Sequence, residues 1–237
     1  MIAAILTIGN ELVSGDVANT NADWLAKRLE PRGVRIVLAA AVPDEPPRIV
    51  DFVRRERERV DHLLVTGGLG GTPDDVTREA LAEAFAVPQE VVPELRDDLR
   101  ARFRGDPEYA ALWAALPAGS EPLVNPLGGA PGFRLANVWV LPGLPREMEA
   151  MFDRYAHRIG GGAPIGSWRG RFRTGELRIA DLLVEATGRW PEVAVGSYPS
   201  FLTDGPEVEI VLKSADAGAL GAAAAWLEPR LAERSRP

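Results

Sequence analysis

The stretch that decides the fold runs from His62 to Ala86 and reads His-Leu-Leu-Val-Thr, then Gly-Gly-Leu-Gly-Gly-Thr-Pro-Asp-Asp, then Val-Thr-Arg-Glu-Ala-Leu-Ala-Glu-Ala-Phe-Ala. Its apolar beginning, Leu63–Val65, is typical of a buried parallel strand. The run Gly67–Gly71 that follows contains four glycines. Glycines let a backbone turn tightly and approach a ligand, because they carry no Cβ. The stretch therefore predicts a strand, a glycine-rich turn and a helix.

The residues after the glycines predict a helix that begins at Pro73. Thr72 stands where an N-cap is favoured, Pro73 suits the first helical position, and Asp75 completes a pattern like a capping box. Free N–H groups and the helix dipole at such a start form an anion site. The alternative is a well-capped turn with two solvated aspartates, and a glycine-rich loop by itself does not separate the two.

Asp74 and Asp75 set a condition on that anion. Carboxylates stabilise the start of a helix, but they repel a phosphate. A divalent cation removes the conflict, because Mg²⁺ commonly bridges one or two carboxylates and substrate phosphates. If the loop binds a phosphate, the paired aspartates predict a divalent metal such as Mg²⁺, Mn²⁺ or Co²⁺.

Composition excludes several classes of protein. The 237 residues are 46% hydrophobic and 26% charged, as in ordinary globular proteins. The net charge of −7 argues against nucleic acid as a partner, because such binding depends on Lys and Arg neutralising phosphates. Without cysteine there are no disulfides or thiolate sites, and His62 and His157 alone make a histidine-based triad or zinc site unexpected. With neither a signal peptide nor an apolar run long enough for a membrane span, we expect a cytoplasmic protein with no membrane partner.

Strands and helices alternate in the first part of the chain. Apolar runs at 2–8, 34–42 and 62–66 read as strands, with helices at Asn21–Glu30 and from Pro46 onward. This alternation predicts an α/β fold, a mostly parallel sheet between helices in three α/β/α layers. Ligands of such sheets bind at the carboxyl ends of the strands. We therefore expect the loop that begins at Asn10 and Glu11, and the loop Gly67–Asp75, at one edge.

The middle of the chain predicts a second turn of the same kind. Two helices at 92–104 and 107–116 precede a constrained Gly/Pro-rich loop at 121–133. A strand at Val138–Leu141 then leads through Pro142 and Gly143 into a helix from Pro145, which is a second candidate anion or ribose site or, equally, a capped turn.

The composition of residues 160–164 is that of a linker. It divides the chain into a first domain, 1–159, and a small α+β domain, 165–237, with the order strand, helix, strand, strand, helix.

Five stretches together carry a resemblance to a known family. They are Thr7–Leu12, Asn19–Asn21, Val65–Thr77, Asn125–Phe133 and Leu141–Met148. In this order they resemble the N-terminal domain of CinA, the competence/damage-inducible proteins, within the molybdopterin-binding (MoCF-like, MogA-like) fold family. The C-terminal unit also looks like the second half of that family's N-terminal region. The sequence ends before the amidohydrolase domain that many CinA proteins carry, so we expect a stand-alone form and do not assign that activity.

The resemblance implies a site for a nucleotide or pterin phosphate. CinA-like N-terminal domains are associated with metal-dependent cleavage of ADP-ribose to AMP and ribose 5-phosphate. Relatives of the fold bind or adenylylate molybdopterin, and a related domain accompanies some eukaryotic FAD synthases. The fold family commonly forms oligomers, so a homodimer is expected.

Two functions from different classes remain open. The first is a metal-dependent nucleotide-diphosphate hydrolase with ADP-ribose as substrate; the second is a module that binds molybdopterin or a nucleotide without turning it over. Asn10 stands where the family usually has Asp, which favours the second slightly.

On the first hypothesis the Gly67–Thr72 backbone holds the diphosphate, Asp74 and Asp75 hold the metal, and Glu11 positions or deprotonates water. Asp75→Asn is then expected to abolish turnover and leave the fold. The candidate site residues are, as catalytic, Glu11, Asp74 and Asp75, and, as ligand-binding, Asn10, Asn19, Asn21, Gly67, Gly68, Gly70, Thr72, Asn125, Gly132, Pro142, Gly143 and Glu147.

Overall fold

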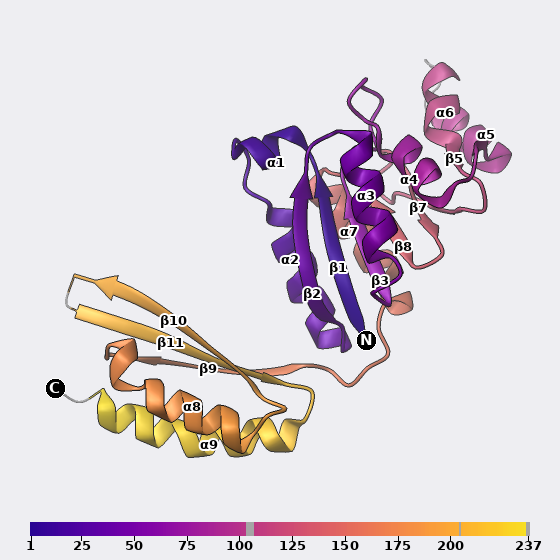
Figure 1. Cartoon of the computed structure of the whole chain (residues 1–237). Coiled ribbons are helices and arrows are strands. Elements are labelled where there is room, and N and C mark those ends of the chain that lie inside the picture. Colours follow the sequence, from indigo (N-terminus) through magenta and orange to yellow (C-terminus); the bar gives the residue numbers. More distant parts are fainter. Residues whose placement is uncertain (103–106, 204, 236–237) are drawn as a thin grey trace. The chain divides into compact units, whose positions relative to one another are not determined.

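The computed structural model in Figure 1 describes residues 1–102, 107–203 and 205–235. Two compact units are present. The first consists of Met1–Leu29 and Val34–Gly161, and the second of Glu30–Gly33 and Gly162–Pro237. Each unit has its own buried core.

The first unit is built around a mixed sheet. Its strands are β1 (Ile2–Ile8), β2 (Arg35–Val42), β3 (His62–Thr66), β4 (Gln89–Val91), β5 (Ala115–Pro117), β6 (Glu121–Leu123), β7 (Gly132–Leu135) and β8 (Val138–Leu141). Its helices are α1 (Asn10–Ser14), α2 (Thr20–Leu29), α3 (Pro46–Glu56), α4 (Thr77–Phe85), α5 (Pro93–Arg102), α6 (Pro107–Ala114) and α7 (Pro145–Tyr155), followed by the 3₁₀ turn η2 (Ala156–Arg158).

The sheet is mostly parallel, as predicted. Its strand order is β2-β1-β3-β8-β7-β6. β1 pairs in parallel with both β2 and β3, and β3 pairs in parallel with β8. β7 and β6 run antiparallel at one edge, while β4 and β5 form a separate two-stranded sheet. The carboxyl ends of β1, β3 and β8 therefore meet at one edge.

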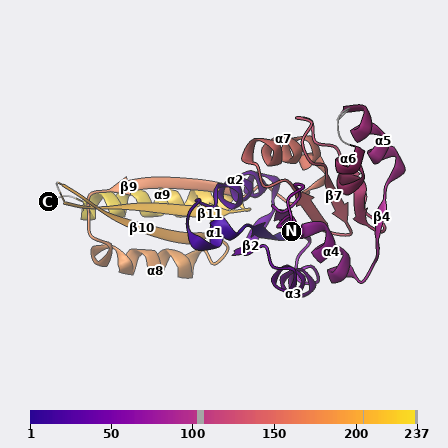
Figure 2. The ribbon, with the colours of Figure 1, turned by 90° about the horizontal axis from the view of Figure 1, so that it is seen from above.

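Helices cover both faces of this sheet, which gives the predicted three layers. Figure 2 shows α2 and α7 on one side of the sheet and α3 and α4 on the other. In β1, Ala4 and Leu6 belong to the core beneath α3 and α4, whereas Ala3 and Ile5 belong to the core beneath α2 and α7. A strand buried on both faces reads as a continuous apolar run, which is why β1 is recognisable in the sequence.

The start of α4 corrects one prediction. The helix begins at Thr77 rather than at Pro73, and Val76 is its N-cap. Thr72 does not act as a cap, because its hydroxyl donates to the carboxylate of Asp75 at 2.6 Å instead of accepting from a helical N–H. The amide of Asp75 donates to the carbonyl of Thr72 at 3.0 Å, which closes a turn within the loop.

Three further differences concern short elements. Residues 10–14 form the short helix α1, where a loop was expected. The stretch predicted as the loop 121–133 contributes the edge strand β6 and the start of its neighbour β7, which pair with each other. The helix predicted at 92–104 is α5 (Pro93–Arg102), and residues 103 and 104 lie outside the described residues.

The second unit has the predicted order of strands and helices. It contains the 3₁₀ turns η1 (Glu30–Arg32) and η3 (Glu176–Arg178), the strands β9 (Gly166–Phe172), β10 (Ala194–Leu202) and β11 (Gly205–Ser214), and the helices α8 (Ala180–Arg189) and α9 (Ala217–Arg234). The antiparallel sheet has the order β10-β11-β9 and shares a core with both helices. Within the described ranges, every helix of the chain is too short or too polar to cross a bilayer.

Candidate functional site

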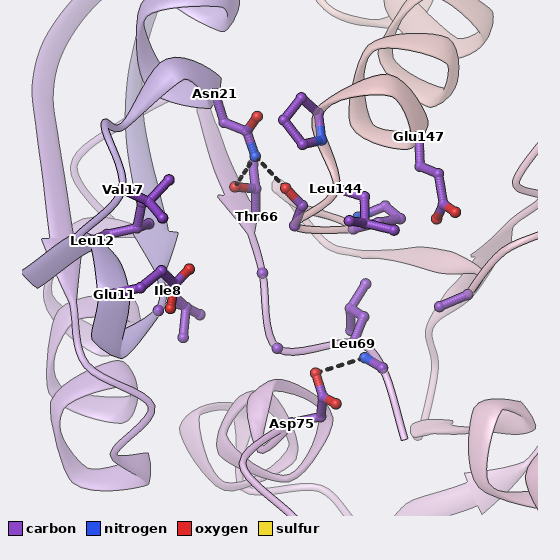
Figure 3. Close-up of a pocket in the computed structure, with 18 of the residues that line it drawn as sticks. Ile8, Glu11, Leu12, Val17, Asn21, Thr66, Leu69, Asp75, Leu144 and Glu147 are labelled. Carbon is purple, nitrogen blue, oxygen red and sulfur yellow. Dashed lines mark hydrogen bonds between the residues drawn. The ribbon is translucent and has the colours of Figure 1, made fainter. Parts of the chain in front are cut away.

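A cavity of about 510 Å³ opens at the edge where β1, β3 and β8 end. Figure 3 shows its labelled side chains converging from the loops after β1 and β3 and from the start of α7. Of the predicted site residues, those that line it are Glu11, Asn19, Asn21, Gly67, Gly68, Gly70, Asp74, Asp75, Pro142, Gly143 and Glu147. Asn10, Thr72, Asn125 and Gly132 are outside the lining.

The loop after β3 turns its carbonyl groups away from the cavity, toward the start of α4. Thr77 donates its hydroxyl to the carbonyl of Gly67 at 2.9 Å and its amide to that of Gly68 at 3.2 Å. The guanidinium of Arg78 donates to the carbonyls of Leu69 and Gly70, both at 2.7 Å. The carbonyls of four successive residues are thus satisfied by the first turn of α4.

The same loop leaves two N–H groups free. The amide of Gly67 donates to the carbonyl of Leu141 at 3.2 Å, and that of Gly70 donates to Asp75 at 2.7 Å. The amides of Gly68 and Leu69 donate to no other described residue, and both residues line the cavity. Successive free N–H groups in a turn make an anion-binding concavity.

The glycines of this loop are required by its geometry. Gly67 has φ 106° and Gly68 has φ 64°, a backbone region that other residues rarely adopt. A Cβ on Gly67 would collide with the carbonyl of Ile8, and one on Gly68 with the hydroxyl of Thr77. The turn after β8 also lies close, because a Cβ on Gly143 would be only 3.2 Å from the Cα of Gly67.

Asp75 closes the loop with both of its carboxylate oxygens. Oδ1 accepts from the amide of Gly70 at 2.7 Å, and Oδ2 accepts from the amide and the hydroxyl of Thr72 at 2.8 and 2.6 Å. Thr72 therefore acts on the site through Asp75 and does not line the cavity itself. The Thr72 side chain also lowers the pKa of the nearby Asp74 carboxylate.

Asp44 is a site residue that the sequence analysis missed. It follows β2 and lines the cavity beside the other carboxylates. Burial raises the pKa of Asp44, a hydrogen bond from the amide of Asn10 opposes that rise, and the negative charges of Glu11, Asp74 and Asp75 add to it. The signal was present in the sequence, since Asp44 comes directly after a predicted strand that ends at the same edge.

Glu11 contributes a further carboxylate to the cavity lining. Its carboxylate lies over Gly9, and it accepts no hydrogen bond from the residues that the structure describes. In Figure 3 Glu11 lies on the opposite side of the view from Glu147.

Asn19 and Asn21, the two asparagines of the cavity lining, have different hydrogen-bonding roles. The side chain of Asn19 donates to Thr7 at 2.7 Å and accepts from the amide of Ala22 at 3.2 Å, so it caps α2 and both of its amide groups are occupied. Asn21 donates to Thr66 at 3.2 Å and to the carbonyl of Gly143 at 2.8 Å. Asn21 is 8% exposed, and its Oδ1 has no hydrogen-bond partner among the described residues. Asn21 thus leaves a buried acceptor for a ligand or a water molecule.

Glu147 forms the other end of the cavity. Its Oε2 accepts from the side chain of Asn125 at 2.8 Å, and its carboxylate packs against Gly129. Asn125 is buried and also donates to the carbonyl of Ala130 at 3.1 Å, so it orients Glu147 from behind. Gly132 is a packing position in β7, because a Cβ there would collide with the carbonyl of Val140.

The lining is rich in negative charge. It contains the carboxylates Glu11, Asp44, Asp74, Asp75 and Glu147, and no Lys, Arg or His among the described lining residues. Yet no three acidic or histidine side chains in the described part of the chain are grouped as a ready-made metal site. This donor set fits a cation that takes one or two carboxylates and completes its shell with water and ligand oxygens, as Mg²⁺ does.

The family model described as "Probable molybdopterin binding domain" matches residues 4–160. The chain belongs to this molybdopterin-binding domain family. Within the family it is CinA-like: a CinA-like protein of Thermomicrobium roseum is 36% identical over 92% of this chain. The chain spans 56% of that protein's length, so nothing about the rest of the CinA-like protein is carried over.

Two other proteins are similar to most of this chain. A protein of Archaeoglobus fulgidus is 36% identical over 82% of this chain and 84% of its own length. The crystal structure of CinA from Thermoplasma acidophilum, described as of unknown function, matches with a TM-score of 0.63 at 30% identity, over 67% of this chain and 97% of that one. Residues 171–236 match a second model, the middle domain of FAD synthase.

Proposed function

We propose that the first unit binds the diphosphate of a nucleotide such as ADP-ribose and hydrolyses it to AMP and ribose 5-phosphate with a divalent cation. The observation that carries this proposal is that N–H donors and carboxylates line the same cavity. The free N–H groups of Gly68 and Leu69 suit a phosphate, and the carboxylates beside them suit a cation that bridges to it.

The cation, when bound, would polarise the phosphoryl oxygens and lower the pKa of an attacking water. Asp74 and Asp75 are the proposed ligands, directly or through water. Because Oδ2 of Asp75 already accepts two hydrogen bonds and Oδ1 accepts one, a single lone pair of Oδ1 remains available to the cation.

The remaining steps use side chains of this chain. Glu11 accepts a proton from the water, whose oxygen forms a bond to one phosphorus. The bond between that phosphorus and the bridging oxygen breaks, and the bridging oxygen leaves with the second phosphate. The N–H groups of Gly68 and Leu69 stabilise the charge that develops on the phosphoryl oxygens. Asn21 Oδ1 accepts from a hydroxyl of the ribose.

A binding module is the second candidate. It is favoured by the absence of a grouped metal-ligand set among the described residues and by Asn10, an amide beside Asp44. On this reading the same cavity holds a molybdopterin or a nucleotide without cleaving it.

The test follows AMP release from ADP-ribose with Mg²⁺, Mn²⁺ or Co²⁺ and with chelator. The informative variant is Glu11→Gln, because the Glu11 carboxylate supports no part of the fold, whereas Asp75→Asn would replace one acceptor that holds the loop. Glu45→Gln is the matched control, since Glu45 is exposed near the same edge and outside the lining.

Metal-dependent release that falls about a hundredfold or more in Glu11→Gln, and stays unchanged in Glu45→Gln, is the expected result. No release by the wild-type chain under any metal would overturn the hydrolase. Saturable binding of ADP-ribose or of a pterin phosphate in that case would establish the binding module.

A further inference from the structure

The cavity lacks a cationic side chain in its described lining, yet a buried cation lies directly behind its glycine loop. Arg78 is 4% exposed, and its guanidinium donates to the carbonyls of Leu69 and Gly70, both at 2.7 Å. It forms no ion pair with any described carboxylate, although Asp75 and Glu79 act on it at longer range. An arginine keeps its charge even when burial lowers its pKa.

A buried charge that is bound only by carbonyl groups lowers the stability of the fold and brings no benefit unless it also serves a function. Removing a guanidinium from water is expensive unless its donors are satisfied. In this chain the carbonyls of Leu69 and Gly70, in the ligand-facing loop, accept hydrogen bonds from the guanidinium. The carbonyl of Gly70 also accepts a hydrogen bond from Nε1 of Trp113 at 3.1 Å. The loop and the charge therefore depend on each other.

The contacts lie on the two ends of a single peptide group. The carbonyl of Leu69 and the amide of Gly70 belong to the same peptide. Arg78 binds its oxygen, and Asp75 accepts from its N–H at 2.7 Å. A cation on the oxygen polarises the group and makes its N–H a stronger donor. The orientation that Arg78 imposes on Leu69 also fixes that residue's free N–H, which belongs to the preceding peptide.

We propose that Arg78 is the positioning residue of the anion site: it holds the loop by two of its carbonyls and supplies positive potential from behind the loop, without touching a bound phosphate. This explains how a cavity with a wholly acidic set of charged side chains can accept a diphosphate. The inference rests on the anion site of the proposed function, but it does not depend on whether the bound diphosphate is cleaved.

The test compares Arg78→Lys with Arg78→Gln. Lysine keeps the charge and glutamine removes it, while neither spans two carbonyls as the planar guanidinium does. The matched control is Arg54→Gln, because Arg54 also donates to a main-chain carbonyl, that of Glu83 at 2.7 Å, but lies outside the cavity lining. Binding of ADP-ribose and of pyrophosphate to each variant of the full chain is measured by titration calorimetry, with the melting temperature as a measure of folding.

We expect Arg78→Gln to bind both probes about tenfold more weakly than the wild type. The affinity of Arg78→Lys should lie between those of Arg78→Gln and the wild type, and that of Arg54→Gln should be unchanged. Because the two Arg78 variants lose the same double hydrogen bond, a difference in affinity between them at similar melting temperatures reports the charge. Equal affinity in the Lys and Gln variants, or wild-type affinity in the Gln variant, would overturn the inference. Failure of the wild-type chain to bind either probe would overturn the anion site and the inference together.

If neither Arg78 variant folds, the inference is tested on the wild-type chain. Side-chain NMR of protein labelled at arginine nitrogen resolves a buried guanidinium, and pyrophosphate is expected to shift that signal. No shift at saturating pyrophosphate would contradict the proposal. Loss of AMP release with the binding differences retained would reject the hydrolase and leave the role of Arg78 in place.

Discussion

Asn10 and Asp44 hold each other at the mouth of the cavity by two reciprocal hydrogen bonds. The amide of Asn10 donates to Asp44 Oδ2 at 2.8 Å, and the amide of Asp44 donates to Asn10 Oδ1 at 3.3 Å. The pair joins the start of α1 to the end of β2, so a residue outside the lining determines where a lining carboxylate stands.

Asn10→Asp is expected to keep this geometry and add a charge. An aspartate retains the oxygen that accepts from the amide of Asp44, while a second carboxylate beside Asp44 increases the attraction for a divalent cation. We expect Mg²⁺ or Mn²⁺ to bind severalfold more tightly, as measured by calorimetry without nucleotide. Unchanged metal binding in the variant would show that the cation binds elsewhere.

Asp44→Asn is expected to stabilise the chain at neutral pH. Burial and three neighbouring carboxylates raise the pKa of Asp44 above the ordinary value of 3.8. A raised pKa in the folded state means that stability is lost as the pH rises through it, and asparagine removes that loss while still accepting from Asn10. The variant should melt about 2 °C higher at pH 7.

The stability gain should vanish below pH 3.8, where the carboxyl group is protonated in folded and unfolded chains alike. Thermal melts at several pH values measure this difference. A variant that melts lower than the wild type at pH 7 would mean that the Asp44 charge is compensated in the folded chain.

Gly68→Ala is expected to damage both folding and binding. Gly68 has φ 64°, and a methyl group there meets the hydroxyl of Thr77. We expect a loss of about 1–3 kcal/mol in the free energy of unfolding and loss of ADP-ribose binding. Denaturant titration measures the first. Gly188→Ala is the control, because a Cβ at Gly188 in α8 meets no atom within 4 Å and should be neutral or stabilising.

Glu147→Gln is expected to separate the two candidate ligands. Glu147 Oε2 accepts from Asn125, whereas Oε1 accepts from no described residue and is available to a ligand. A pterin offers two adjacent N–H groups to a carboxylate, while adenine offers one amino group beside an acceptor. The variant should therefore lose about tenfold in affinity for a pterin and less for ADP-ribose, as measured by competition. Equal losses of affinity for the two ligands would mean that Glu147 does not bind the ring of either one.

The sequence was sufficient where local pattern and tertiary structure agree. Leu63–Val65 is apolar because β3 is buried on both faces, and the loops after β1 and β3 meet because parallel strands end at the same edge. The sheet, its layers and much of the cavity lining follow from these facts.

Other features depend on contacts that no local pattern contains. Thr72, Pro73 and Asp75 fit a helix start and a closed turn equally well, and the choice is made by the amide of Gly70, which takes the Asp75 carboxylate. The edge strand β6 and its neighbour β7 consist of three and four residues, too short to show a period of two.

The close approach of Gly67 and Gly143 has a consequence for how this protein can be changed. A Cβ on Gly143 would lie 3.2 Å from the Cα of Gly67, so the turn after β8 has little room for a side chain at this position. Substitutions at other positions of the two turns should therefore be non-additive, because each turn is packed against the other. Selection for folding after random mutagenesis should retain glycine at position 67 whatever residue stands at position 143, because a Cβ on Gly67 would also collide with the carbonyl of Ile8.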